Sequence, residues 1–114
     1  VNALDGPAYI ERVTVDSPKN VRKAKKAIKK AFQNQIDGVG YSFIEVVSTC
    51  PTNWGMTPQA AFAWMRENML PYYPLGVVRD VVADGFANAA EAAAARNAAC
   101  PIAHPEKAEE GEAK

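Results

Sequence analysis

The chain has 114 residues, of which 48% are hydrophobic and 23% charged, and its formal net charge at neutral pH is zero. This length allows at most one ordinary domain. No run approaches the roughly 20 apolar residues that span a membrane, and the N-terminus lacks the basic and apolar regions of a signal peptide. Two cysteines, Cys50 and Cys100, are too few for a disulfide framework. We therefore expect a cytoplasmic protein without a membrane partner.

The first half of the chain predicts a strand, a helix and a second strand. Residues 8–15 are rich in β-branched and aromatic types, which is typical of a strand. Ser17 and Pro18 suit the N-cap and first position of a helix that should end at Gly38. Residues 41–48 form an apolar run of the kind that is buried on both faces of a sheet. Together they predict a right-handed parallel βαβ unit of a three-layer α/β fold.

The helix has one apolar stripe, and lysines occupy most of its remaining surface. The stripe consists of Val21, Ala24, Ala27, Ile28, Ala31, Phe32 and Ile36. The cations are Lys19, Arg22, Lys23, Lys25, Lys26, Lys29 and Lys30. These cations could bind phosphate, but aromatic residues are not interleaved with them, so we expect no nucleic-acid partner. A solvated helix face, or a face that docks an acidic protein partner, explains them better.

The second strand ends abruptly in a loop rich in Pro, Asn and Gly, which is residues 48–55. Pro51 fixes its own φ and favours extended geometry at Cys50. Cys50 is thus expected at the carboxyl edge of the sheet, where loops of α/β proteins bind cofactors. A single cysteine can equally be a small buried hydrophobic residue. Cys50 is 50 residues before Cys100 and further still from His104, so the three residues do not have the short spacing that preorganises a metal or redox site.

The rest of the chain predicts a helix, an extended arm and a tail. Thr57 and Pro58 repeat the cap-then-proline start of a helix, and Pro71 should end it. Residues 71–76 then form a stiff arm with two prolines and two tyrosines. We divide the chain into residues 1–80, an alanine-rich helix over 81–100 and a disordered acidic tail over 101–114. Removing everything after residue 80 should change stability little.

Three stretches, residues 23–32, 43–55 and 71–76, resemble the C-terminal part of the β subunit of 2-oxoacid:ferredoxin oxidoreductases. The resemblance is to the 2-oxoglutarate and branched-chain 2-oxoacid types and covers roughly residues 3–80. It implies the C-terminal βαβ portion of a parallel-sheet domain that binds thiamine diphosphate with Mg²⁺. It further implies an enzyme that decarboxylates a 2-oxoacid, forms an acyl-coenzyme A and reduces ferredoxin, with α and γ subunits as partners.

The same resemblance implies that Cys50, in its Cys-Pro-Thr loop, is the fourth ligand of a [4Fe-4S] cluster. The family's other three cysteines are missing from this chain, as is the Gly-Asp-Gly motif that holds Mg²⁺. We therefore expect a fragment of the subunit that is inactive alone, and we assign no catalytic residue and no other cofactor-binding residue. The alternative is a non-enzymatic module that docks a partner through the basic helix and the Tyr-Pro arm.

Overall fold

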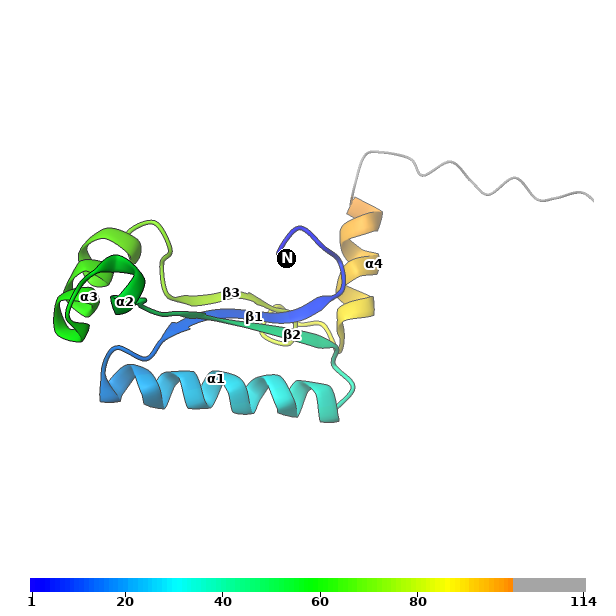
Figure 1. The fold of residues 1–114 in the computed structure, drawn as a ribbon. Helices are drawn as coiled ribbons and strands as arrows, with labels where there is room; N and C mark the ends of the chain where they lie inside the picture. The colour runs from blue at the N-terminus through cyan, green and yellow to red at the C-terminus, as the bar shows by residue number, and fades with distance from the viewer. Residues whose placement is uncertain (100–114) are drawn as a thin grey trace, which may run out of the picture.

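The computed structural model describes residues 1–99, so the predicted tail over 101–114 lies outside the described residues. The elements are β1 (Pro7–Thr14), α1 (Pro18–Ile36), β2 (Tyr41–Val47), α2 (Pro51–Trp54), α3 (Pro58–Trp64), the π-helical turn η1 (Met65–Met69), β3 (Gly76–Asp80) and α4 (Ala89–Ala99). They form an α/β structure with a three-stranded sheet (Figure 1). Within residues 1–99, no helix is long and apolar enough to cross a bilayer.

The predicted parallel βαβ unit is present as β1, α1 and β2. The two strands pair in parallel from Pro7 opposite Tyr41 to Thr14 opposite Val47. Ser17 has extended backbone geometry, and its hydroxyl accepts a hydrogen bond from the Asn20 amide at 3.3 Å, as expected of an N-cap. The helix ends just before Gly38, which has a φ of +68° that favours glycine.

The sheet is mixed, which corrects the expectation of an all-parallel sheet. β3 pairs antiparallel with β1 on the side opposite β2, so the strand order is β2-β1-β3. The strand begins at Gly76, the last residue of the predicted arm, two residues beyond Pro74, where backbone N–H groups become available for pairing. Arg79 of β3 also fastens the N-terminal segment, because its guanidinium donates to the carbonyls of Asn2, Leu4 (2.6 Å) and Pro7 (3.1 Å).

α1 covers one face of the sheet through small residues. Ala24 and Ala27 are buried against Val13, with Ile44 packed beside them. In residues 1–99 the opposite face is covered by α4 at one end of the sheet and by the N-terminal segment, so the expected third layer is only partly present (Figure 1). The predicted apolar stripe is also only partly buried, because its outer members Ile28, Phe32 and Ile36 are exposed. A helix lying on a flat sheet buries only the part of its surface that faces the strands.

α4 docks against the amino end of β2 and the start of β1. Ala89 and Ala92 are buried in a cluster with Ala8 and Val81, beside Val39 and Phe86. The helix begins at Ala89, and the residues between β3 and Asn88 form turns, so the helix occupies the alanine-rich second half of the predicted unit 81–100. The Asn88 carboxamide oxygen accepts from the Glu91 amide at 2.9 Å, and this cap explains the start at Ala89.

Gly40 is the close-approach point between α4 and the sheet. It has a φ of +138°, and a Cβ there would lie 2.8 Å from the Cβ of Ala89 and 3.2 Å from that of Ala8. The Ala89 amide donates to the Val39 carbonyl at 2.8 Å, which holds the backbones together. Glycine at position 40 therefore allows the helix to reach the sheet.

Candidate functional site

The candidate site lies at the carboxyl end of β2, where the sequence predicts it. Cys50 follows β2 by three residues, is exposed, and occupies the N-cap position of the short helix α2. Because β1 and β2 are parallel, the residues after β1, including Asp16, reach the same end of the sheet. An exposed thiol at this end corrects the alternative in which Cys50 is a buried structural residue.

Local hydrogen bonds hold the segment that carries Cys50. The buried Thr14 hydroxyl donates to the Val47 carbonyl at 3.0 Å, which fixes the end of β2 to β1. The Trp54 amide donates to the Cys50 carbonyl at 3.0 Å, and the Met56 amide donates to the Pro51 carbonyl at 3.0 Å. The predicted loop is therefore one turn of helix that starts at Pro51, a position that suits a residue without an N–H.

α2, α3 and η1 form a small lobe beside the site (Figure 1). The rings of Trp54 and Trp64 pack with centroids 5.0 Å apart and planes tilted by 57°. This contact makes Trp54 a packing residue between α2 and α3. The predicted helix start is confirmed, since the Thr57 hydroxyl accepts from the Ala60 amide at 3.3 Å.

Arg66 ties the lobe to the end of β1. Its Nε donates to the Asp16 carboxylate at 2.6 Å and its Nη2 donates to the Asp16 carbonyl at 2.9 Å. The Asn20 side chain donates to the other carboxylate oxygen of Asp16 at 2.6 Å. The sequence does not reveal this pair, because 50 residues separate its members.

The surroundings of the Asp16 carboxyl lower its pKa. Burial opposes ionisation and raises its pKa, but the hydrogen bonds from Asn20 and Arg66 and the charge of Arg66 outweigh burial. The net result is a pKa below the ordinary aspartate value. The carboxylate therefore stabilises the fold in its charged form.

Glu45 lies in β2 and forms an ion pair with Arg12 of β1. Arg12 Nε donates to the Glu45 carboxylate at 2.7 Å, across the two neighbouring strands. The same guanidinium lies 5.5 Å from the centroid of the Tyr73 ring in the Tyr-Pro arm. Arg12 thus links the arm to the sheet, which gives both Glu45 and the arm a structural role.

Within residues 1–99, no three His, Cys, Asp or Glu side chains come together in a way that could hold a metal ion. Cys50 is the single cysteine in this part of the chain. Cys100 and His104, considered as partners for it, lie outside the described residues. The described residues can therefore supply one thiolate to an iron-sulfur cluster, and the other ligands would have to come from elsewhere.

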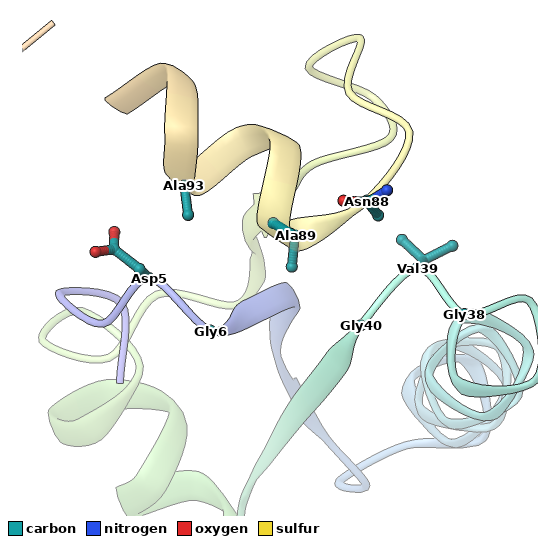
Figure 2. Close-up of a pocket in the computed structure, with 9 residues that line it drawn as sticks. Asp5, Gly6, Gly38, Val39, Gly40, Asn88, Ala89 and Ala93 are labelled. Carbon is teal, nitrogen blue, oxygen red and sulfur yellow. The ribbon is translucent and has the colours of Figure 1, made fainter. Parts of the chain in front are cut away.

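A hollow on the surface lies away from this edge. It has a volume of about 540 Å³ and lies between α4 and the link from α1 to β2 (Figure 2). Its lining is Asp5, Gly6, Gly38, Val39, Gly40, Asn88, Ala89, Ala90 and Ala93. It sits at the amino end of β2, and that strand, about 23 Å long, separates it from the end that leads to Cys50. Its lining consists mainly of small side chains with one carboxylate, and these residues do not form a catalytic group.

These observations define an α/β unit with an exposed thiol on a fixed turn at the carboxyl end of its parallel strands. The chain is 44% identical over 77 residues to ketoisovalerate oxidoreductase subunit VorA of Methanothermobacter marburgensis. It is 43% identical over 77 residues to the subunit of that name from Methanothermobacter thermautotrophicus. Each match covers 68% of this chain but only 16% of the relative.

The matched stretch includes the candidate site. Wherever it starts, a stretch of 77 residues within 114 contains residues 38–77, and hence Cys50 and the whole lobe. No protein-family model matches the chain, and no solved structure matches it. The chain is thus similar to part of an oxidoreductase subunit and spans about one sixth of that subunit's length.

Proposed function

We propose that this chain is a segment of a 2-oxoacid:ferredoxin oxidoreductase, from the C-terminal part of its β subunit. The observation that carries the proposal is the 44% identity to ketoisovalerate oxidoreductase subunit VorA over a stretch that contains the Cys50 turn. The enzyme would oxidatively decarboxylate a 2-oxoacid to an acyl-coenzyme A and pass the electrons to ferredoxin. Because the chain corresponds to 16% of the relative, we expect it to be inactive alone.

Cys50 is proposed as one thiolate ligand of a [4Fe-4S] cluster. It is exposed, and its backbone is held by Pro51 and by the hydrogen bond from Trp54. A thiolate whose backbone is fixed fits a cluster ligand, because little ordering is needed when iron binds. The cluster, when bound, would supply one-electron transfer toward ferredoxin. The remaining three ligands would come from protein outside this chain.

The site for thiamine diphosphate and its Mg²⁺ is proposed to lie outside residues 1–99. Mg²⁺ sites need oxygen ligands brought to one place, and the described residues contain no such group of carboxylates. The carboxyl end of β1 and β2 would still face the cofactor, as loops do in parallel α/β sheets. The proposed partners are the α and γ subunits, ferredoxin, a 2-oxoacid and coenzyme A.

The test replaces the matched segment of full-length M. marburgensis VorA with this chain and compares Cys50 with Cys50→Ser in the assembled enzyme. We expect Cys50→Ser to lose cluster iron and ferredoxin reduction, because serine is a harder and poorer ligand for iron than a thiolate. The loss should exceed the roughly tenfold effect of removing a supporting group around a metal. Affinity for thiamine diphosphate should be unchanged.

Two matched variants control this experiment. Cys100→Ser removes the other thiol, and Thr52→Ser alters the same turn without touching the proposed ligand. Both should keep iron and electron transfer. Full iron content and normal ferredoxin reduction in Cys50→Ser would refute the ligand role. An inactive but well-folded wild-type chimera would instead favour the alternative, a non-enzymatic module that docks through α1 and the Tyr-Pro arm, where Tyr72 is 81% exposed.

A further inference from the structure

The lobe formed by α2, α3 and η1 is held to the α/β unit by the side chain of one residue. Figure 1 shows the lobe beyond the carboxyl ends of β1 and β2. In the described part of the chain, neither buried cluster of the α/β unit includes a residue of the lobe. Within residues 1–99, the side-chain hydrogen bonds that leave the lobe all come from Arg66. The orientation of the lobe on the sheet therefore depends on Arg66.

The two hydrogen bonds of Arg66 fix an orientation as well as a distance. Nε donates to the Asp16 carboxylate at 2.6 Å, and Nη2 donates to the Asp16 carbonyl at 2.9 Å. A planar guanidinium that is held through two donors defines a direction, which a single ion pair does not. Arg66 lies in the π-helical turn η1, which the Leu70 amide closes by donating to the Met65 carbonyl at 3.1 Å. Such turns are rare and occur frequently at functional sites.

The Asp16 side chain is a rigid anchor for this contact. It is 5% exposed, and the Asn20 side chain donates to its second carboxylate oxygen at 2.6 Å. The Asn20 amide in turn donates to the hydroxyl of Ser17, the N-cap of α1. Asp16 follows β1 by two residues, and β1 pairs with β2. Arg66 thus ties the lobe to a fixed point at the same end of the sheet as Cys50.

The lobe in turn holds the turn that carries Cys50. Cys50 is the N-cap residue of α2, and its carbonyl accepts a hydrogen bond from the Trp54 amide. The Trp54 ring packs on the Trp64 ring at a centroid distance of 5.0 Å, and Trp64 lies two positions before Arg66. A rotation of the lobe would therefore carry α2 and the Cys50 turn with it.

We propose that Arg66 is a positioning residue for Cys50, because its contact with Asp16 holds the lobe and the lobe holds the Cys50 turn. This inference rests on the proposed function. A [4Fe-4S] cluster needs its thiolate ligands at defined places around it. Since the other three would come from outside this chain, Cys50 has to be presented in one orientation relative to the sheet. Arg66 acts through the lobe and is not itself a ligand.

Distances between two nitroxide labels, measured by double electron–electron resonance, test this orientation without a cluster. One label is attached to Cys50 and the other to α1 through Lys29→Cys, in the 114-residue chain carrying Cys100→Ser. Lys29 is exposed on a helix that packs on the sheet. Arg66→Gln should make the distribution of distances at least about twice as wide, because the lobe then samples more than one orientation. Equal widths overturn the proposal.

Further variants separate positioning from charge. Asp16→Asn should also widen the distribution, and the double variant should be no wider than Arg66→Gln alone, since both changes act on one contact. Arg66→Lys keeps the charge but lacks the planar fork, so it should widen the distribution as well. Arg22→Gln removes an exposed arginine of α1 and is the matched control. A parental width in Arg66→Lys, or an equally widened one in Arg22→Gln, contradicts the proposal.

Cluster stability tests the consequence for iron binding. In the chimera in which this chain replaces the matched segment of M. marburgensis VorA, Arg66→Gln should speed the loss of iron to a chelator about tenfold, as removal of a group that supports a metal ligand does. The unfolding midpoint of the isolated chain should fall by only a few degrees, because the Arg66 side chain is 49% exposed. Arg22→Gln should change neither. An unchanged rate of iron loss, or faster loss only in variants that are already unfolded, overturns the proposal.

The outcomes distinguish this proposal from the proposed function. If Cys50→Ser keeps its iron while Arg66→Gln widens the distances, Cys50 is not a ligand and Arg66 still positions its turn. If Cys50→Ser loses its iron while Arg66→Gln changes neither the distances nor the rate of iron loss, the ligand role stands and positioning by Arg66 is refuted.

Discussion

At the scale of residues, the positions that matter most are those where the chain approaches itself closely or pairs charges. Pro18 and Thr57 mark helix starts in the structure as their local chemistry predicts, and Pro51, which was predicted in a loop, starts a short helix as well. Local signals of this kind can be read from sequence because the interacting atoms lie within four residues. The contacts of Asp16 with Arg66 and of Gly40 with Ala89 join distant parts of the chain, so no local pattern reveals them.

Gly40→Ala should destabilise the protein by about 2 kcal/mol or more, through both backbone strain and overlap with Ala89. Gly38→Ala is the matched control. Gly38 also has positive φ, but no atom lies within 4 Å of the position of an added Cβ. It should cost about 1 kcal/mol from strain alone. Urea unfolding of both variants measures the difference, and equal costs would contradict the close approach of α4.

The depressed pKa of Asp16 predicts a specific acid dependence of stability. A carboxyl whose folded pKa lies below its unfolded value stabilises the fold above the unfolded value, about 3.9. That contribution is lost as pH falls through the folded pKa. Asp16→Asn should cost about 1 kcal/mol at neutral pH and reduce the loss of stability that follows as the pH falls below the unfolded value. Urea unfolding across this range is the measurement, and an unchanged slope would contradict it.

At the scale of elements, prediction worked where the hydrophobic period is long and failed where an element is short. The 19 residues of α1 repeat their apolar pattern over several turns, so the helix is evident from sequence. β3 has five residues after a proline-rich arm, and such a run has too few alternations to identify a strand. Its place beside β1 depends on pairing between residues about 70 positions apart, which only the fold reveals.

α4 should contribute measurably to stability, contrary to the expectation from its alanine-rich sequence. Removing residues 81–114 would delete Val81, Ala89 and Ala92 from the cluster around Ala8. Burying one Val side chain is worth about 1.5 to 3 kcal/mol, so the unfolding midpoint should fall by roughly 5 °C or more. Removing residues 100–114 alone is the control, with little change expected. Equal midpoints for both truncations, measured by circular dichroism, would show that α4 is dispensable.

At the scale of the whole molecule, the fold class could be predicted from the sequence. Which surfaces of the fold are covered by other residues could not. The βαβ unit and the position of Cys50 at the carboxyl edge follow from patterns within β1, α1 and β2. Which surfaces of that unit are covered depends on contacts of the whole chain, and the exposure of Phe32 and Ile36 is not visible in a helical stripe. A stripe predicts that residues share a face, but not how much of that face has a neighbour.

The hydrogen bonds from Arg79 to the N-terminal segment can form only late in synthesis of the chain. Its guanidinium donates to the carbonyls of Asn2, Leu4 and Pro7, which are 72 to 77 residues earlier in the chain. A ribosome adding 5–20 residues per second needs about 4 to 15 s to make that interval. Until β3 has been made, β1 can pair only with β2, and its other edge and the carbonyls of the N-terminal segment have no partner from β3.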